Sequence, residues 1–293
     1  GGGGWDALDG ASGHDVLLPG SGGAAAGGRD AMNGGQGDDI FIVESDVWFQ
    51  DMNITDTGLT QLQLVNKGAG FRQGNGIGVD EVRFTQDVAG NIILGVTNAL
   101  GVAQIFTGIE RVVIGQGTAA AADRTGNADI NLDASLANPG LNVGLEIQGN
   151  AGINTIIGTA FSDTIDGGQG ADVMEGGLGN DIYVVDDAAD VVNELTGSGL
   201  DTVQSSITYT LGAEIESLTL TGGGALQGTG NGAANVLIGG AGANLLSGLA
   251  GADTISGGAG ADTIVGGAGG AAGGWDGSCA GATPQAGNTY NFG

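Results

Sequence analysis

Residues 167–184 read GGQGADVME GGLGNDIYV, which are two consecutive copies of one nine-residue unit. The unit has the form Gly-Gly-x-Gly-x-Asp-x-U-x, where U is a large apolar residue. Its last three residues predict a short strand that turns one apolar side chain inward, because successive residues of a strand face opposite ways. The glycines permit the positive φ angles and close backbone approach of a tight turn. One unit is therefore a turn followed by a strand, and two units make one coil of 18 residues.

The unit recurs along the chain, which we divide into repeat blocks, β-rich connectors and a tail. The division is block 1 at 1–42, a connector at 43–148, block 2 at 149–184, a connector at 185–229, block 3 at 230–279 with a decayed last copy, and a tail at 280–293. Short β-branched runs in the connectors predict strands that continue the solenoid. The apolar U residues predict one inner stack: Leu8, Leu17, Met32, Phe41, Ile156, Ile165, Met174, Tyr183, Leu237, Leu246, Ile255 and Ile264.

The composition supports an ordered repeat protein. The chain of 293 residues contains 65 Gly but only 3 Pro, and it has no three-residue period, so it is not collagen-like. Aromatic residues make up only 4%, which is too few to fill a large globular core, whereas a solenoid packs small aliphatic side chains between its turns. The predicted fold is all-β: a right-handed parallel β-roll or β-helix solenoid with calcium bound in its Gly-rich turns. The segment nearest to a helical pattern is 123–136.

The charge balance restricts the partners. With 33 acidic residues against 6 basic ones, the formal net charge is −27. Such a surface disfavours nucleic acid and anionic bilayers and favours multivalent cations. Nothing in the sequence resembles a membrane span, and the single Cys279 forbids an internal disulfide.

The sixth position of the unit predicts several calcium ions. Turns 18 residues apart lie on the same edge of the coil, about 4.8 Å from one another, and each presents carbonyl oxygens and one carboxylate to the gap. Calcium takes such hard oxygen ligands at about 2.3–2.6 Å. Asn replaces Asp at Asn154, Asn235 and Asn244, where we expect weaker or absent calcium because a charge is missing. The candidate side-chain ligands are Asp6, Asp15, Asp30, Asp39, Asp163, Asp172, Asp181, Asp253, Asp262, Asn154 and Asn244.

Stacked carboxylates repel one another when no cation lies between them, which favours an expanded chain. We therefore expect metal binding and folding to be one event, so that a chelator abolishes the β circular dichroism.

The tandem units resemble the repeats-in-toxin (RTX) nonapeptide, the calcium-binding parallel β-roll of proteins exported by type I secretion. Copies beginning at Gly1, Gly34, Gly167, Gly176 and Gly257 match at every defined position. The resemblance implies a secreted, calcium-folded protein of the large surface type, such as S-layer, matrix or fibre proteins. It also implies carbonyl ligands at the matching glycines: Gly34, Gly35, Gly37, Gly167, Gly168, Gly170, Gly176, Gly177, Gly179, Gly257, Gly258 and Gly260.

The chain lacks the residues of common catalytic sites, so we expect no enzyme activity. His14 is the only His, which excludes zinc-protease spacing, and no nucleophile elbow stands at a strand-to-helix junction. A coil that begins with a complete repeat exposes strand edges, which either another domain or another copy of the chain would cover. Covering by another copy would be head-to-tail self-association into a filament or lattice. The predicted function is a calcium-dependent structural protein of an extracellular layer, filament or adhesive matrix. Two alternatives remain open: a carboxy-terminal secretion and folding module of an exported enzyme or toxin, and, less favoured, an ice- or glycan-binding adhesin.

Overall fold

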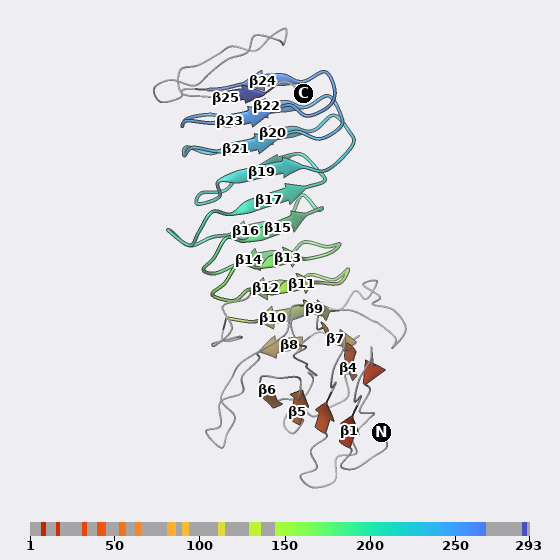
Figure 1. Ribbon diagram of the computed structural model, residues 1–293. Coiled ribbons are helices and arrows are strands. Elements are labelled where there is room, and N and C mark those ends of the chain that lie inside the picture. The colour runs from red at the N-terminus through yellow and green to blue at the C-terminus, as the bar shows by residue number, and fades with distance from the viewer. Residues whose placement is uncertain are drawn as a thin grey trace. The chain divides into compact units, whose positions relative to one another are not determined.

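The computed structural model describes residues 111–114, 129–135 and 144–267, and outside these ranges the backbone of nine further strands. All regular elements in this described part are β-strands, most of them three or four residues long (Figure 1). They are β1 (Ala7–Asp9), β2 (Val16–Leu17), β3 (Ala31–Asn33), β4 (Ile40–Glu44), β5 (Asn53–Asp56), β6 (Leu62–Val65), β7 (Glu81–Thr85), β8 (Gly90–Ile93), β9 (Arg111–Ile114), β10 (Ile130–Asp133), β11 (Glu146–Gln148), β12 (Thr155–Ile157), β13 (Thr164–Asp166), β14 (Val173–Glu175), β15 (Ile182–Val185), β16 (Val191–Asn193), β17 (Thr202–Ser205), β18 (Tyr209–Thr210), β19 (Ser217–Leu220), β20 (Gln227–Thr229), β21 (Val236–Ile238), β22 (Leu245–Ser247), β23 (Thr254–Ser256), β24 (Thr263–Val265) and β25 (Thr289–Asn291).

The chain forms two compact units, Gly1–Val173 and Met174–Gly293. In the first unit, β2, β4, β7, β9, β11 and β13 are successive neighbours in one sheet, and β8, β10 and β12 in another. Both sheets are parallel where the pairing is described. A third sheet has the order β1, β3, β5, β6, and its last pair is antiparallel. This antiparallel pair lies in the first connector and departs from the parallel coil.

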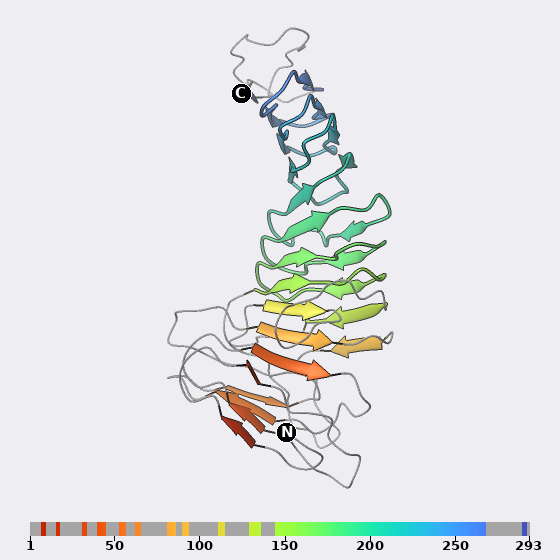
Figure 2. The same cartoon turned by 90° about the vertical axis from the view of Figure 1, so that its right-hand side faces the viewer.

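The second unit is a regular parallel coil. One sheet runs through β15, β17, β19, β21, β23 and β25, and the other through β18, β20, β22 and β24. From β17 on, successive strands of the chain alternate between the two sheets, so each of these coils contributes one strand to each, whereas β16 pairs with β14 in a separate sheet. Figure 1 and Figure 2 show these coils, coloured green to blue, following one another in chain order. Strands β16 to β20 belong to the second connector, so this connector continues the coil of the repeats.

One apolar residue from most of the described strands fills the interior of the coil. In the second unit, the register brings together Tyr183, Val203, Leu218, Leu237 and Ile255, all of them 0% exposed. Burying each of these side chains contributes about 1.5–3 kcal/mol. The predicted inner-stack residues whose side chains are described are all at most 1% exposed, which confirms the stack for Ile156, Ile165, Met174, Tyr183, Leu237, Leu246, Ile255 and Ile264. The side chains of Leu8, Leu17, Met32 and Phe41 lie outside the described residues.

The predicted fold class is confirmed: the chain is an all-β solenoid of stacked parallel coils. Segment 123–136, the one nearest to a helical pattern, contains a strand instead: β10 occupies part of it and pairs in parallel with β8 and β12. Sheet pairing there outweighs a weak local helical pattern that a Gly-Asn pair already interrupts. Among the described residues, no helix is long and apolar enough to cross a membrane.

Candidate metal centre

Each glycine of the repeat that begins at Gly167 has its own structural reason. A Cβ on Gly167 would lie 2.3 Å from the Asp172 Oδ2 atom, so the first glycine makes room for the carboxylate at the sixth position. Gly168 and Gly170 have φ angles of 93° and 123°, in the left-handed region that other residues avoid. A Cβ on Gly170 would also lie 2.4 Å from the carbonyl oxygen of Gly152, one coil earlier. The turn therefore stacks directly on the turn before it.

The contact at the fourth position recurs along the coil. In each case, a Cβ at the fourth position would fall on the carbonyl oxygen of the fourth residue of the turn one coil earlier. The distances from such a Cβ to that oxygen are 1.5 Å for Gly199 and Gly179, 2.0 Å for Gly242 and Gly224, 2.0 Å for Gly251 and Ala233, and 2.5 Å for Gly260 and Gly242. Carbonyl oxygens of one turn thus face the backbone of the next, as the predicted ligand arrangement requires.

The sixth-position side chains are buried and accept hydrogen bonds from the backbone. Asp163, Asp172, Asp181 and Asp253 are at most 2% exposed, whereas Asp262 is half-buried. Each accepts an N–H from the corresponding residue one coil earlier where such a bond is described: Leu145 N–H to Asp163 (2.5 Å), Asn154 N–H to Asp172 (2.7 Å), Asn235 N–H to Asp253 (3.0 Å) and Asn244 N–H to Asp262 (2.9 Å). The carboxylates of Asp163, Asp172, Asp181 and Asp253 therefore lie inside the edges of the coil rather than pointing into solvent.

Burial disfavours the ionised form of Asp163 and Asp253. It raises the pKa of Asp163 to about 6, although the N–H groups of Leu145 and Thr159 and the Thr159 hydroxyl act in the opposite direction. Burial likewise raises the pKa of Asp253, against the N–H of Asn235. A cation beside these groups would offset the cost of their charge.

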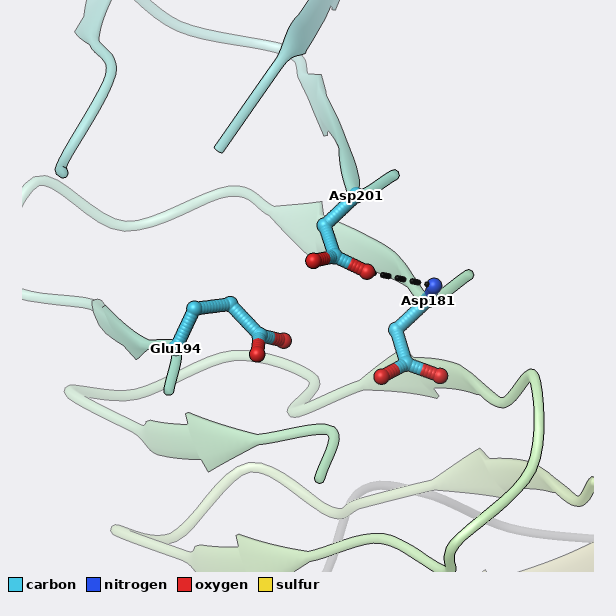
Figure 3. A group of neighbouring side chains, drawn as sticks. All are labelled: Asp181, Glu194 and Asp201. Atoms are coloured by element: carbon cyan, nitrogen blue, oxygen red, sulfur yellow. Dashed lines mark hydrogen bonds between the residues drawn. The ribbon is translucent and has the colours of Figure 1, made fainter. Parts of the chain in front are cut away.

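Three carboxylates converge in the second unit (Figure 3). Asp181 directly precedes β15, Asp201 directly precedes β17 and Glu194 follows β16. One ligand oxygen from each lies within 4.8 Å of the other two. Asp181 and Asp201 are 0% exposed, and the N–H of Asp181 donates to Asp201 Oδ1 at 2.8 Å. Figure 3 shows the carboxyl group of Glu194 pointing toward the other two side chains.

Glu194 is oriented by two hydroxyl groups. The buried Tyr183 hydroxyl donates to Glu194 Oε1 and accepts the N–H of Gly176 at 2.6 Å. The Ser198 hydroxyl donates to Glu194 Oε2 at 2.7 Å. Burial raises the pKa of Glu194 to about 7, and the charge of Asp201 adds to this rise while the Ser198 hydroxyl opposes it. Glu194 is therefore held in place with a carboxyl group that changes its charge near neutral pH.

Comparison with known families explains the stacked turns. The family model of the RTX calcium-binding nonapeptide repeat (4 copies) matches residues 1–17, 25–44, 148–183 and 238–270. This chain carries RTX calcium-binding nonapeptide repeats. The matches fall on the three repeat blocks read from the sequence, and the β-roll of such repeats is typically non-catalytic. No curated protein matches the chain.

The converging carboxylates fit the calcium that RTX repeats bind. In a shell with calcium–oxygen distances of about 2.3–2.6 Å, two ligand oxygens lie no more than about 5 Å apart. The oxygens of Asp181, Glu194 and Asp201 meet this limit. Hard anionic oxygens are also the donor type that calcium prefers, whereas this group of three offers neither nitrogen nor sulfur.

All ligand assignments, Asp181 included, stay predictions. Among the described candidates, the carboxylates lie along the edges of the coil and the glycines in its stacked turns. The candidates Asp6, Asp15, Asp30, Asp39, Gly34, Gly35 and Gly37 lie outside the described residues.

Sequence reasoning missed Glu194 and Asp201. Asp201 had a signal, because residues 196–204 read TGSGLDTVQ, a degenerate RTX unit that lacks only its first glycine. Gly197 at its second position has the positive φ angle of 77° seen in intact units. Glu194 had no signal, since it lies between two units and matches no position of either.

Proposed function

We propose that this chain is a secreted structural protein, a β-roll that folds on several calcium ions and serves as a building block of an extracellular layer, filament or adhesive matrix. The observation that supports it is the burial of the sixth-position carboxylates in columns along the coil. Carboxylates that are almost fully buried destabilise a metal-free coil unless they are protonated or paired with a cation. Calcium between the turns supplies that pairing.

The secreted and structural parts of the proposal rest on the family. RTX repeat proteins are generally secreted by the type I route. A coil of stacked parallel strands offers strand edges with which another copy can pair, which suits head-to-tail association between copies. The net charge of −27 keeps separate chains apart until a divalent cation reduces their repulsion.

The test is a calcium titration followed by circular dichroism, light scattering and electron microscopy on the same samples. We expect β structure to appear with calcium and to be lost in excess chelator, and ordered polymers to form with millimolar calcium. A spectrum unchanged by chelator would overturn the calcium-dependent fold. Dispersed monomers with a normal calcium transition would overturn the building-block role and favour a folding module of a larger exported protein.

A matched pair of variants tests the metal centre itself. Asp201→Asn and Asp187→Asn each remove one negative charge from the second unit. Asp201 is 0% exposed within the carboxylate cluster, whereas Asp187 is exposed and its carboxylate accepts only the nearby N–H of Ala189 in the described contacts. We expect Asp201→Asn to lose bound calcium and Asp187→Asn to keep it. Equal calcium binding by the two variants would remove this site from the proposal.

A further inference from the structure

The first coil of block 3 has Asn, not Asp, at both of its sixth positions. Asn235 and Asn244 are each 2% exposed. The Oδ1 atom of Asn235 accepts the N–H of Asn231 at 2.8 Å, and that of Asn244 accepts the N–H of Gly240 at 2.9 Å. In both residues the Oδ1 atom is therefore directed into the residue's own turn, and the amide nitrogen Nδ2 is directed toward the preceding coil.

These amide nitrogens donate to the backbone of the second connector. Asn235 Nδ2 lies 3.2 Å from the Ile215 carbonyl oxygen and 3.4 Å from that of Glu216. Asn244 Nδ2 lies 3.5 Å from the Leu226 carbonyl oxygen. On the same edge as Asn235, Asn231 Nδ2 donates to the carbonyl oxygens of Gly212 at 2.7 Å and Ile215 at 2.8 Å. Three amides thus join the first coil of block 3 to carbonyl oxygens of the connector.

A carboxylate at these positions has no hydrogen to donate. Asp in place of Asn235 would put a negative oxygen against the Ile215 and Glu216 carbonyl oxygens, and only a cation between them would make the contact favourable. The Asn amide therefore does in these two turns what calcium is proposed to do in the turns with Asp. The repeat pattern alone predicts only that Asn weakens calcium binding, whereas the hydrogen bonds of Asn235 and Asn244 indicate what the amide contributes in place of the metal.

We propose that Asn231, Asn235 and Asn244 form an amide seam that folds without metal. The seam excludes calcium from the turns that contain Asn235 and Asn244. It also keeps the two coils formed by residues 211–247 folded when calcium is absent. The inference rests on the proposed calcium-dependent folding of the neighbouring turns.

The amide seam also prepares the next coil. The N–H groups of Asn235 and Asn244 donate to the carboxylates of Asp253 and Asp262 at 3.0 and 2.9 Å. If the seam is already folded, these N–H groups are held in place before calcium binds. The turns that contain Asp253 and Asp262 can then form against a coil that is already ordered. Folding of block 3 would then proceed from the connector toward the carboxyl end as calcium binds.

The test is amide hydrogen exchange of the full chain in chelator and in calcium. The informative N–H groups are those of Val236 and Leu245, which donate to the carbonyl oxygens of Glu216 and Leu226 across the seam. We expect both to stay protected in chelator, whereas the Thr164 N–H, which donates to Leu145 beside the buried Asp163, loses protection. Free exchange of Val236 and Leu245 in chelator would overturn the seam. Protection of all three N–H groups in chelator would instead overturn calcium-dependent folding and leave the seam intact.

A variant separates the amide from mere packing. In chelator, Asn235→Asp should lower the protection of Val236 by about tenfold or more, because a buried donor is lost and like partial charges face each other. Calcium should restore the protection, since the new carboxylate completes a set of oxygen ligands. The control is Gln227→Glu, the same amide-to-acid change on the exposed side chain of β20. Equal exchange in the two variants, or an Asn235→Asp chain that calcium does not restore, would overturn the proposal.

Discussion

The contact at the fourth position predicts that Gly199→Ala is severely destabilising. The new Cβ would lie 1.5 Å from the carbonyl oxygen of Gly179, whereas ordinary contact needs about 3.5 Å. Since the obstacle is backbone, the two turns would have to separate by about 2 Å, roughly two fifths of the 4.8 Å spacing between coils. Overpacking of this kind costs about 1–3 kcal/mol and occasionally more, and we expect at least about 3 kcal/mol here. The change would also move Asp201 away from Asp181, to which it is hydrogen-bonded at 2.8 Å.

The control for this prediction is Gly223→Ala. A Cβ on Gly223 meets nothing within 4 Å, and neither Gly199 nor Gly223 has a positive φ angle. The control is expected to be neutral or to stabilise the chain by up to about 1 kcal/mol, because Ala restricts the unfolded state. The assay is denaturant unfolding with and without calcium, together with calcium binding. Equal denaturation midpoints for the two variants would refute the argument that backbone stacking requires glycine at the fourth position.

Two further predictions follow from the raised pKa values. Burial raises the pKa of Asp163 from 3.8 to about 6, so the folded chain keeps this proton to higher pH than the unfolded chain. In calcium-free buffer, where protonation of buried carboxylates stabilises the coil at acid pH, the contribution of Asp163 to the free energy of unfolding should therefore fall by about 3 kcal/mol as the pH rises from about 3 to about 7, and urea denaturation of Asp163→Asn should lack this decrease. Because the pKa of Glu194 is about 7, calcium must displace a proton at pH 6, which titration calorimetry in two buffers of different ionisation enthalpy would detect. The same proton release from Glu194→Gln would show that another group supplies it.

The coil could be predicted from the sequence because its determinants are local. Each nine-residue unit contains its own turn glycines and its own inward residue, so Ile165, Met174 and Tyr183 were assigned to the core without any knowledge of their neighbours. The register between coils then follows from stacking the units. The reasons for the individual glycines could not be separated in this way. Only the structure shows that Gly167 makes room for a carboxylate, whereas Gly170 makes room for a carbonyl oxygen.

The carboxylate cluster could not be predicted because its residues come from coils of unequal length. The register places Tyr183, Val203, Leu218, Leu237 and Ile255 opposite one another although they are 20, 15, 19 and 18 residues apart. A search for repeats at a spacing of 18 residues therefore misses the coil that ends at Val203. It also misses Asp201, the sixth-position residue of that coil. The additional residues of that coil form the segment that brings Glu194 to the site. Its position depends on the path of the connector in three dimensions, which no local pattern encodes.

Unequal coil lengths also imply that metal binding varies along a uniform core. The strands stay in register, and the turns accommodate the extra or missing residues. The carboxylate that accepts the backbone N–H of the sixth-position residue one coil earlier therefore differs between coils. Asp201 accepts the N–H of Asp181, and Glu216 accepts the N–H of Asp201 at 2.8 Å. The packing of the core does not depend on whether Asp or Glu accepts this N–H. Calcium affinity, in contrast, rises with the number of charged ligands at the site. Calcium should therefore be held most firmly where Asp181, Glu194 and Asp201 converge, and not at all where Asn235 donates to carbonyl oxygens instead. We therefore expect a single structural repeat to combine turns that require metal with turns that replace it, because the sixth side chain differs from coil to coil.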